Sequence, residues 1–363
     1  MLTVNLDRFK LAIKNCTLFC DGGGTYGKFI HIFITPNTLN IVGGENTGQA
    51  RIVNEQIAIE SSDTFDKWIP ADLISEVSKT LRGETCELIT NENGIMLKNG
   101  FFKINIPCVN LPASLIQTLT TLQWDNVCEA DANIANVLST LAHIAPREGI
   151  PGSRAILIAN NKALSYNSMC FALLKHSNTY TQNIIIPKNF VRYATILDRN
   201  GAYKVCKSEN WHRLMNQDRV VYIGKEMYPV DARYLQVDEK ISFRYEITIN
   251  NRDDLITELN KMEAAKSRDL NHIVKIKVFT DHLDLGFEND SSQAFTKIPI
   301  TSPETIPDGY QFLISIQWLI DAAKACTGAE LKMKLQESQA ARSVLLTDGS
   351  MTEIVTIIIN GEN

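Results

Sequence analysis

The chain has 363 residues, of which 44% are hydrophobic and 21% charged, and its formal net charge is −5. This length predicts two or three folded domains, and the composition is that of a globular protein. No stretch approaches the roughly 18 to 20 apolar residues that a membrane span needs, and the first ten residues carry charges instead of a signal-peptide core. We therefore expect a cytoplasmic protein without a membrane partner.

Eight cysteines are scattered along the sequence, and their spacing excludes two further classes of protein. Cys16 and Cys20 lack a second Cys or His pair at zinc-ligand spacing, so no metal site is expected. Reduced, buried thiols are expected in place of a disulfide framework. The negative net charge argues against a protein coated with lysine and arginine, but it does not exclude cations gathered on one face.

Pro70 is the first of three anchor residues, followed by Pro187 and Ser315. Each anchor ends an apolar stretch and precedes apolar residues three or four positions apart, the spacing of one helix face. Helices are therefore predicted over 71–82, 188–199 and 316–326. Their apolar stripes are Leu73, Ile74, Val77 and Leu81; Phe190, Val191, Ala194 and Leu197; and Trp318, Leu319, Ala322 and Ala323.

A second predicted helix precedes each anchor, over 6–16, 131–147 and 251–268. After every helix, alternating apolar residues and turn dipeptides predict short strands, as in CELITNENGIMLKNGFFKINIP. The chain thus contains six copies of a helix followed by strands. We predict that they pair into three domains over residues 1–121, 122–237 and 238–363.

A short helix with one apolar face is not stable alone, but it can bury that face on a small antiparallel sheet. Two such units side by side make one compact domain. The sequence therefore predicts an α+β fold of three similar domains, each with two helices packed on antiparallel sheets, arranged as a curved array.

Three stretches carry a resemblance to a known family. They are IPADLISEVSKTLRGETCELITNENGIMLKNGFFKINIP, MYPVDARYL and YQFLISIQWLIDAAKACTGAELKMKL. In order and spacing they resemble the bacterial DNA polymerase III beta subunit, the sliding clamp, over essentially the whole chain. The resemblance implies three clamp domains in an arc that forms a head-to-tail homodimer, a closed ring with helices lining the hole and sheets outside.

The same resemblance implies a function. Duplex DNA would thread the ring without sequence readout, and the clamp would act as a processivity factor that tethers the replicative polymerase and raises its effective concentration at the template. A clamp loader is the second implied protein partner. Neither a catalytic step nor a cofactor is implied, and the location is cytoplasmic, at the nucleoid.

Charge on the predicted helices is compatible with DNA in the hole. The helices over 6–16 and 188–199 each hold three cations against one carboxylate, and the six helices together sum to about +4, which leaves −9 for the rest of the chain. A mildly positive bore attracts phosphates without reading bases. Helix surfaces ordinarily carry such cations, so the residues alone leave a plain solvated face open. With the resemblance, the expected DNA-binding residues are Arg8, Lys10, Lys14, Lys28, Lys79, Arg82, Arg147, Arg154, Lys188, Arg192, Arg199 and Lys266.

Clamps of this family bind short partner peptides in an apolar pocket that includes the C-terminal strand. The residues that match this pocket are Met169, Phe171, Pro229, Arg233, Tyr234, Ile357, Ile358 and Ile359. The chain departs from the family pattern at YNSMCF (166–171) and at the terminal INGEN, so we expect a reshaped pocket for a different peptide. The alternative is that 357–359 is simply a core strand.

The implied dimer interface also departs from the family. Phe102 and Ile104 are retained on the first-domain side, whereas Ala265, Lys266 and Arg268 stand on the third-domain side, where the family has large aliphatic residues. Loss of two buried aliphatic residues weakens such a contact, so we expect either a weakly closed ring or closure through other contacts, such as charge pairs from Lys266 and Arg268. Divergence of this kind would suit a phage or mobile-element replication system.

Two other classes of function compete with this one. An enzyme is disfavoured because the six histidines show no HExxH or triad-like pattern, DHLDLGFEND lacks the calcium-loop spacing, and GGGTYG is not followed by GK[ST]. The second alternative is a clamp-like scaffold that recruits replication or repair proteins without encircling DNA. The clamp and the scaffold differ in whether the protein is retained on circular DNA.

Overall fold

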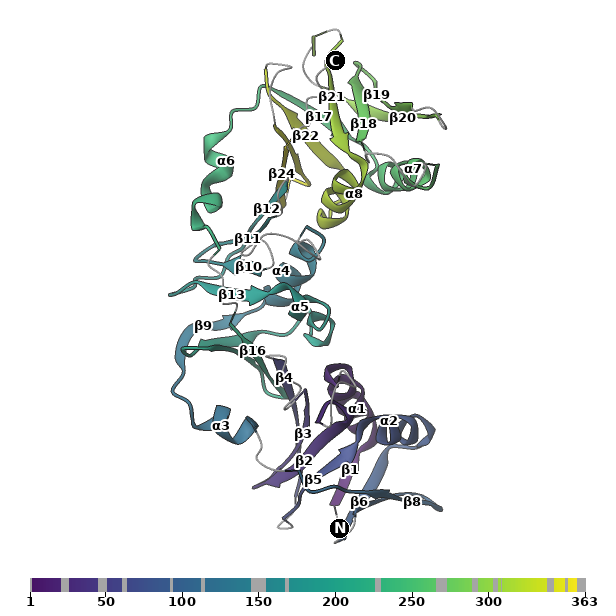
Figure 1. Ribbon diagram of the computed structural model, residues 1–363, viewed down its shortest axis with the longest axis vertical. Coiled ribbons are helices and arrows are strands. Elements are labelled where there is room, and N and C mark those ends of the chain that lie inside the picture. The colour runs from purple at the N-terminus through teal and green to yellow at the C-terminus, as the bar shows by residue number, and fades with distance from the viewer. Residues whose placement is uncertain are drawn as a thin grey trace. The chain divides into compact units, whose positions relative to one another are not determined.

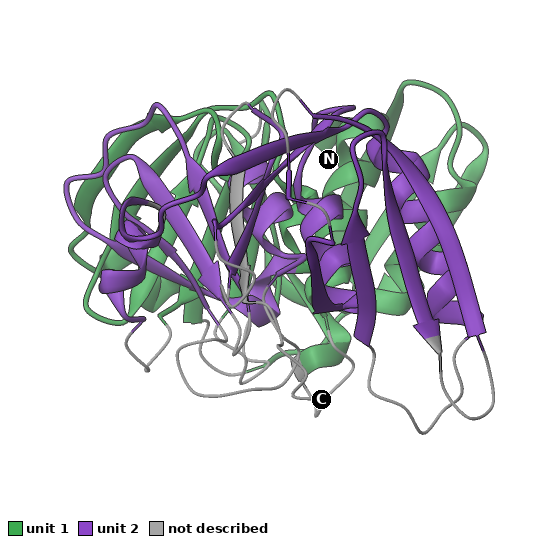
Figure 2. Cartoon of the chain, turned by 90° about the horizontal axis from the view of Figure 1, so that it is seen from above, with its two compact units in different colours: residues 1–134, 192–225 green, residues 135–191, 226–363 purple. Residues whose placement is uncertain are grey.

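The computed structural model shows an α+β protein in which every described pair of strands is antiparallel (Figure 1). It describes residues 2–20, 26–44, 51–60, 64–91, 94–111, 115–144, 155–166, 170–225, 230–265, 273–288, 293–302, 306–307, 309–337, 343–349 and 352–357. The chain divides into two compact units, residues 1–134 with 192–225 and residues 135–191 with 226–363 (Figure 2). This division runs through the second predicted domain, so the three domain boundaries stay a prediction.

One order of elements occurs three times: strand, helix, four strands, helix, three strands. The first copy is β1 (Leu2–Asn5), α1 (Leu6–Phe19), β2 (Phe29–Thr35), β3 (Thr38–Gly43), β4 (Arg51–Ala58), β5 (Asp66–Pro70), α2 (Ala71–Thr80), β6 (Thr85–Asn91), β7 (Gly94–Asn99) and β8 (Phe102–Pro107). The second is β9 (Asp125–Asp131), α4 (Ile134–Leu141), β10 (Ala155–Ile158), β11 (Lys162–Tyr166), β12 (Cys170–Lys175), β13 (Ile184–Pro187), α5 (Lys188–Val191), β14 (Tyr203–Lys207), β15 (Trp211–Met215) and β16 (Arg219–Gly224). The third is β17 (Tyr245–Ile249), α7 (Arg252–Ala265), β18 (Ile273–Val278), β19 (His282–Glu288), β20 (Gln293–Thr301), β21 (Gln311–Ser315), α8 (Ile316–Ala325), β22 (Leu331–Leu335), β23 (Ser343–Thr347) and β24 (Thr352–Ile357).

The three anchors have the predicted place in this order. Pro70, Pro187 and Ser315 each end the fifth strand of a copy, and a helix begins at the next residue. Shorter elements lie outside the repeat: η1 (Tyr26–Lys28), α3 (Leu115–Thr121), η2 (Ala194–Ile196), η3 (Ala232–Gln236) and α6 (Val237–Lys240). The threefold repetition read from the sequence is therefore confirmed by the order of elements.

Each copy divides its strands between two sheet portions, and the portions join from one copy to the next. The four middle strands of the first copy join the remaining four of the second through the pair β4–β16, which gives an eight-stranded sheet. The four middle strands of the second copy likewise join the remaining four of the third through β12–β24. Two portions have no such neighbour: β8 ends the sheet β1-β6-β7-β8, and β20 pairs with β17 only at Ile300 and Thr301.

Helix α1 is held closely against the eight-stranded sheet. Asn5 caps it by accepting a 3.0 Å hydrogen bond from the Arg8 backbone N–H, and Phe9, Ile13 and Phe19 are buried on the sheet side. Gly43 of β3 permits this approach, because a Cβ atom there would lie 2.1 Å from the Cys16 carbonyl oxygen. Helix α2 lies beside α1 (Figure 1). The first unit thus presents two helices on one side of a sheet.

The second unit repeats this packing with α7 and α8. Ser315 caps α8 through its hydroxyl oxygen, which accepts from the Trp318 N–H, and Leu319, Ala322 and Ala323 are buried beneath the helix. All eight cysteines lie among the described residues, and none forms a disulfide, as expected. Within the described ranges, no helix is both long and apolar enough to cross a membrane.

The helix predicted over 188–199 is wrong in extent. Only Lys188–Val191 is α-helical, and a turn and the short 3-10 helix η2 follow. The reason lies in tertiary contacts: the Arg219 guanidinium donates a hydrogen bond to the Ile196 carbonyl, and the Tyr203 hydroxyl accepts one at 2.8 Å from the Asp198 N–H. These contacts satisfy backbone groups that a longer helix would have paired internally.

Candidate nucleic-acid and peptide interfaces

Among the exposed cations of the first unit are residues of α1, of α2 and of the 192–199 segment. Lys14 and Arg199 are exposed and have no ion-pair partner among the described residues, and Lys28 is exposed at the end of η1. Arg82 follows α2 and donates to the Lys79 carbonyl at 3.1 Å, while Lys79 itself pairs with Glu76 at 2.6 Å on the same helix. Such exposed pairs are weak, so these charges remain available to phosphate.

Other predicted DNA-binding residues make contacts within the chain. The Arg8 guanidinium is 2.7 Å from the Asp218 carboxylate, and Lys10 Nζ donates to the Leu81 carbonyl at 2.8 Å, which joins α1 to the end of α2. Lys188 Nζ is buried. The exposed Arg192 guanidinium lies over the Tyr193 ring at 4.6 Å. These residues have structural roles here, and their role toward DNA stays a prediction.

The 192–199 segment is fixed to α1 through aromatic and buried polar contacts. The rings of Phe19 and Tyr193 are 4.8 Å apart, and the Arg51 guanidinium lies 4.1 Å from the centroid of the Tyr193 ring. Because Arg219 bonds both the Glu55 carboxylate and the Ile196 carbonyl, the segment cannot move independently of the sheet. Lys14, Arg192 and Arg199 therefore belong to one rigid part of the molecule.

Helices of the second unit supply few cations. Helix α4 has no charged residue, α8 has one of each sign, and α7 holds two cations against four carboxylates within its described length. Positive helical charge is therefore concentrated in the first unit. Predicted residues that lie outside the described ranges are Arg147, Arg154, Met169, Pro229, Ile358, Ile359, Lys266 and Arg268.

Three aromatic rings gather at the site predicted for partner peptides. The ring of Tyr234 in η3 is 4.6 Å from that of Phe171 in β12 and 5.1 Å from that of Tyr166 in β11. The rings are partly buried over an apolar cluster, and burial raises the pKa of the Tyr166 hydroxyl. The buried members of that cluster are Ala155, Leu157, Leu164, Leu173 and Val230.

Polar groups border these rings. Asp231 caps η3, and its carboxylate holds the exposed Arg233 side chain in a two-point ion pair at 2.6 and 3.0 Å. Hydrogen bonding from Arg233 lowers the pKa of Asp231. Lys162 Nζ donates to the Leu235 carbonyl at 3.0 Å and fixes η3 to β11. The site is thus an aromatic surface on an apolar base, with one exposed cation at its border.

The C-terminal strand adjoins this site, because β24 pairs with β12 and Val355 lies opposite Phe171. Ile357, the last residue of β24, pairs with Ser343. Sequence reasoning missed Tyr166, although a signal was present: Tyr166 ends one predicted strand and Phe171 lies in the next, and the two residues are directly opposite each other in the β11–β12 pair. The role of the whole group in binding a peptide stays a prediction.

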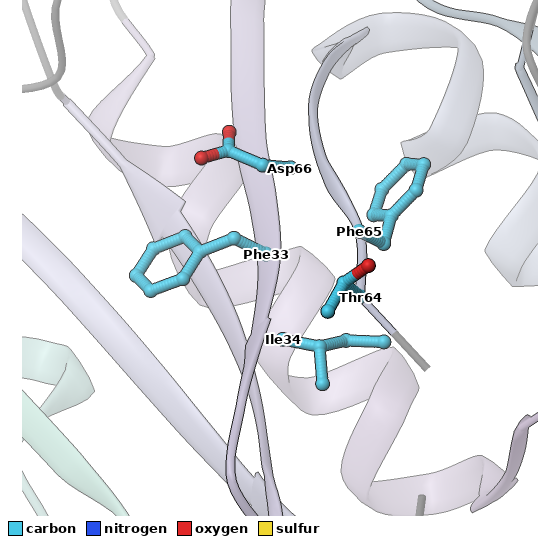
Figure 3. Close-up of a pocket in the computed structure, with 5 residues that line it drawn as sticks. All are labelled: Phe33, Ile34, Thr64, Phe65 and Asp66. Atoms are coloured by element: carbon cyan, nitrogen blue, oxygen red, sulfur yellow. The ribbon is translucent and has the colours of Figure 1, made fainter. Parts of the chain in front are cut away.

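A separate pocket of about 250 Å³ lies at the β2–β5 edge of the first unit (Figure 3). Phe33, Ile34, Thr64, Phe65 and Asp66 line it. The Asp66 carboxylate is bonded to His31 Nε2 at 2.7 Å, and the His31 ring stacks on Trp68 at 4.5 Å. Since its one charged group is already engaged by a buried histidine, we assign this pocket no ligand.

Comparison with known proteins identifies the fold. No family model matches the sequence, and no curated protein matches it. The structure is similar to the DNA polymerase III subunit beta from Pseudomonas aeruginosa, with a TM-score of 0.80 and 9% identity over 99% of this chain and 100% of that one. It is similar to a sliding clamp (DNA polymerase III subunit beta) from Bartonella birtlesii bound to griselimycin, with a TM-score of 0.82 and 15% identity over 99% of both chains.

A third similar structure is the Helicobacter pylori beta clamp bound to DNA ligase peptide, with a TM-score of 0.78 and 10% identity over 99% of this chain and 100% of that one. At these identities the likeness establishes the fold and nothing finer. The chain has the fold of bacterial beta sliding clamps over its whole length. The fold class and the resemblance drawn from the sequence are thereby confirmed.

Proposed function

We propose that this protein is a DNA sliding clamp: two chains close a ring around duplex DNA, and the ring tethers a polymerase. The observation that carries the proposal is the pattern of joined sheet portions, in which the outer edge of β8 in the first copy and most of β20 in the third copy have no joined portion beside them. The role is one of binding and tethering without a catalytic step. The fold supports it, since the similar structures are sliding clamps.

If β8 of one chain pairs with β20 of another, the pattern of strand pairs between successive copies continues from chain to chain. Within the chain, the third middle strand of one copy pairs with the last strand of the next, as in β4–β16 and β12–β24. By the same rule, β20 of one chain pairs with β8 of a second chain. Open edges are templates for such pairing. A head-to-tail contact made twice by two chains closes a ring.

The register of this contact follows from equivalent positions. Phe102 is the first residue of β8 after a two-residue turn, and Arg219 has the same position in β16. Thr296 of β20 and Glu55 of β4 are likewise equivalent, because each has the same place in the strand pairing of its copy. Since Arg219 lies opposite Glu55, Phe102 lies opposite Thr296. Ile104 then lies opposite Ala294. Large side chains thus face small ones, and the third-domain side of the contact includes β20 as well as the predicted Ala265.

DNA binding rests on the cations of the first unit. Replacing Lys14 and Arg199 by glutamate is expected to weaken binding to duplex DNA at every sequence and to lower the slope of log K against log salt by about 0.9 for each phosphate that the protein no longer neutralises. Binding is measured by titrating salt against a nicked circular plasmid. Lys332→Glu, on β22 beside Glu246, is the control and leaves the slope unchanged.

The same assay separates a clamp from a scaffold. Several predicted DNA-binding cations are engaged inside the chain and α7 is acidic, and both observations favour a scaffold that recruits proteins without encircling DNA. A clamp stays on a closed circle at moderate salt and slides off once the circle is cut. If cutting the circle makes no difference to retention, the encircling role is wrong.

Partner binding is assigned to the three rings. Tyr234→Ala and Phe171→Ala are each expected to weaken binding of a peptide from the cognate polymerase about tenfold or more, because aromatic groups dominate such contacts. Isothermal calorimetry measures the affinity. Phe101→Ala, at an exposed hairpin turn elsewhere, is the control. Unchanged affinity in both ring variants would remove the peptide assignment while leaving the DNA role intact.

A further inference from the structure

One exposed sheet surface in the second unit lies outside the candidate nucleic-acid and peptide interfaces, and it shares only strand β20 with the proposed contact between chains. We call it the lysine–phenylalanine face, and it consists of Lys275, Lys277, Phe279, Phe295 and Lys297. Alternate residues of β18 and β20 are exposed on this face, while Ile276, Val278 and Ile298 point to the core. Strands β18, β19 and β20 lie side by side (Figure 1). The exposed residues therefore share one side of a continuous sheet.

The two phenylalanine rings of this face are supported flat against the protein. Phe295 is 70% exposed, and its ring covers Gly286 of β19, where a Cβ atom would lie 2.6 Å from Phe295 Cδ1. Phe279 is 42% exposed and stacks on His282, with centroids 4.6 Å apart and planes 9° apart. Each ring thus contacts the protein on one side and keeps part of its surface exposed to solvent. The two positions are separated by four residues, roughly 13 Å, along the strand direction and by two inter-strand steps of roughly 4.8 Å each across β19.

Charge on the face is mixed: three lysines share it with Asp284 and, by strand register, with Glu288. Lys277, Asp284 and Lys297 lie next to one another across three strands, and Asp284 is 3.5 Å from Lys297 Nζ and 3.2 Å from His282 Nε2. The Asp281 carboxylate is held 2.6 Å from His282 Nδ1 at the turn. Lys275 and Lys277 have no ion-pair partner among the described residues. Two lysines therefore remain for an external anion.

We propose that the lysine–phenylalanine face binds a single-stranded polynucleotide. Unpaired bases would stack on Phe279 and Phe295, and Lys275 and Lys277 would contact the phosphates. Flat aromatic rings interleaved with cations on an open surface are the recurring chemistry of sequence-tolerant single-strand binding. A duplex keeps its base faces stacked inside, so it cannot use the rings. The proposal concerns a surface other than the basic helices and stands without them.

An acidic peptide is the competing occupant, and the geometry disfavours it. Peptide anchors enter concave pockets, whereas here both rings lie along an open sheet surface. The proposed pairing between chains would also leave the face open, because strands meet edge to edge. That pairing would place Lys103 of the second chain opposite Phe295 and add a further cation to the face.

Fluorescence anisotropy of labelled oligothymidine and oligouridine tests the proposal on the full chain. Phe295→Leu keeps an apolar side chain over Gly286 but removes the planar ring, and we expect about tenfold weaker binding. Phe295→Trp should restore the affinity. Lys275→Glu with Lys277→Glu should lower the slope of log K against log salt by about 0.7 for each phosphate left without a lysine. Comparing the two oligonucleotides shows whether DNA or RNA is preferred.

The Lys14→Glu, Arg199→Glu variant separates this site from the proposed clamp function. It should lose duplex retention and keep oligothymidine binding, whereas Lys275→Glu with Lys277→Glu, on β18 and outside the proposed contact between chains, should do the reverse. The proposal is overturned if Phe295→Leu and the double lysine variant, each with an unchanged melting temperature, bind oligothymidine as the parent does. It is equally overturned if only the Lys14→Glu, Arg199→Glu variant loses oligothymidine, or if polyglutamate binds this face and oligothymidine does not.

Discussion

Replacing Phe102 and Ile104 by aspartate is expected to convert a two-chain assembly into single chains. Phe102 is 45% exposed on the edge strand β8, an unusual place for a large apolar side chain unless something covers it. In the proposed contact, two carboxylates would be buried against Ala294 and Thr296 without partners. Each costs about 1 to 3 kcal/mol or more, so dimer affinity should fall at least a hundredfold. Sedimentation equilibrium measures the mass.

Phe101→Asp is the matched control, since Phe101 projects from the turn before β8 and is fully exposed. The register itself is tested by pairing Ile104→Cys with Ala294→Cys. Residues directly opposite in an antiparallel pair have Cβ atoms close enough for a disulfide, so oxidation should join two chains covalently. A parent chain that sediments as a monomer at high micromolar concentration, or an aspartate variant that remains a dimer, would contradict the proposed pairing of β8 with β20.

Local chemistry explains why the threefold repeat could be predicted from sequence. A proline or a capping serine at Pro70, Pro187 and Ser315 stops a strand and allows a helix to begin, and apolar spacing then marks the buried face. Hairpins are equally local, because a turn brings consecutive strands together. These signals need no knowledge of distant residues, and the elements they predicted are present.

The strand pairs that join one copy to the next, which we call seams, could not be predicted in this way. Asn54 of β4 and Val220 of β16 lie opposite each other although they are far apart in sequence. The sequence of neither strand indicates which strand it will pair with. The same limit applies to the cations. A charge count treats Arg8 and Lys14 alike, but the fold brings Asp218 to Arg8 and leaves Lys14 exposed. Which cations can meet DNA is decided by tertiary neighbours that a helix pattern does not contain.

The short helix α5 shows that tertiary contacts also decide where a helix ends. Phe190 and Val191 follow a helical pattern, and one helical turn forms there. Beyond it, buried Arg219 captures the Ile196 carbonyl, and the chain turns. A tertiary hydrogen bond to a charged donor outweighs the weak preference of a few residues for a helix. For a related reason the predicted peptide-site residues include Phe171 and Tyr234 but not Tyr166. Strand pairing places Tyr166 opposite Phe171, and both rings contact that of Tyr234.

Removing Arg219 is expected to destabilise the first unit strongly. Glu55 is 3% exposed and Arg219 7%, and the Glu55 carboxylate also accepts a 2.9 Å hydrogen bond from Asn15 Nδ2 of α1. Arg219→Ala would leave that carboxylate buried without its cation, at a cost of about 3 to 5 kcal/mol. Urea unfolding followed by tryptophan fluorescence reports it well, because Trp68, Trp124 and Trp211 belong to the first unit. The midpoint should fall by roughly 1 to 2 M.

The double variant Glu55→Leu, Arg219→Met distinguishes a buried charge from impaired packing. It removes both charges at similar volume, and buried ion pairs replaced in this way commonly recover their stability or exceed it. We expect its midpoint to lie near that of the parent and well above that of Arg219→Ala. At the equivalent position the second seam pairs Ala172 with Ile354, and the proposed third seam pairs Thr296 with Phe102, so an uncharged first seam is compatible with the fold. A double variant less stable than Arg219→Ala would show that the pair holds α1 and β16 by a geometry that apolar packing cannot replace.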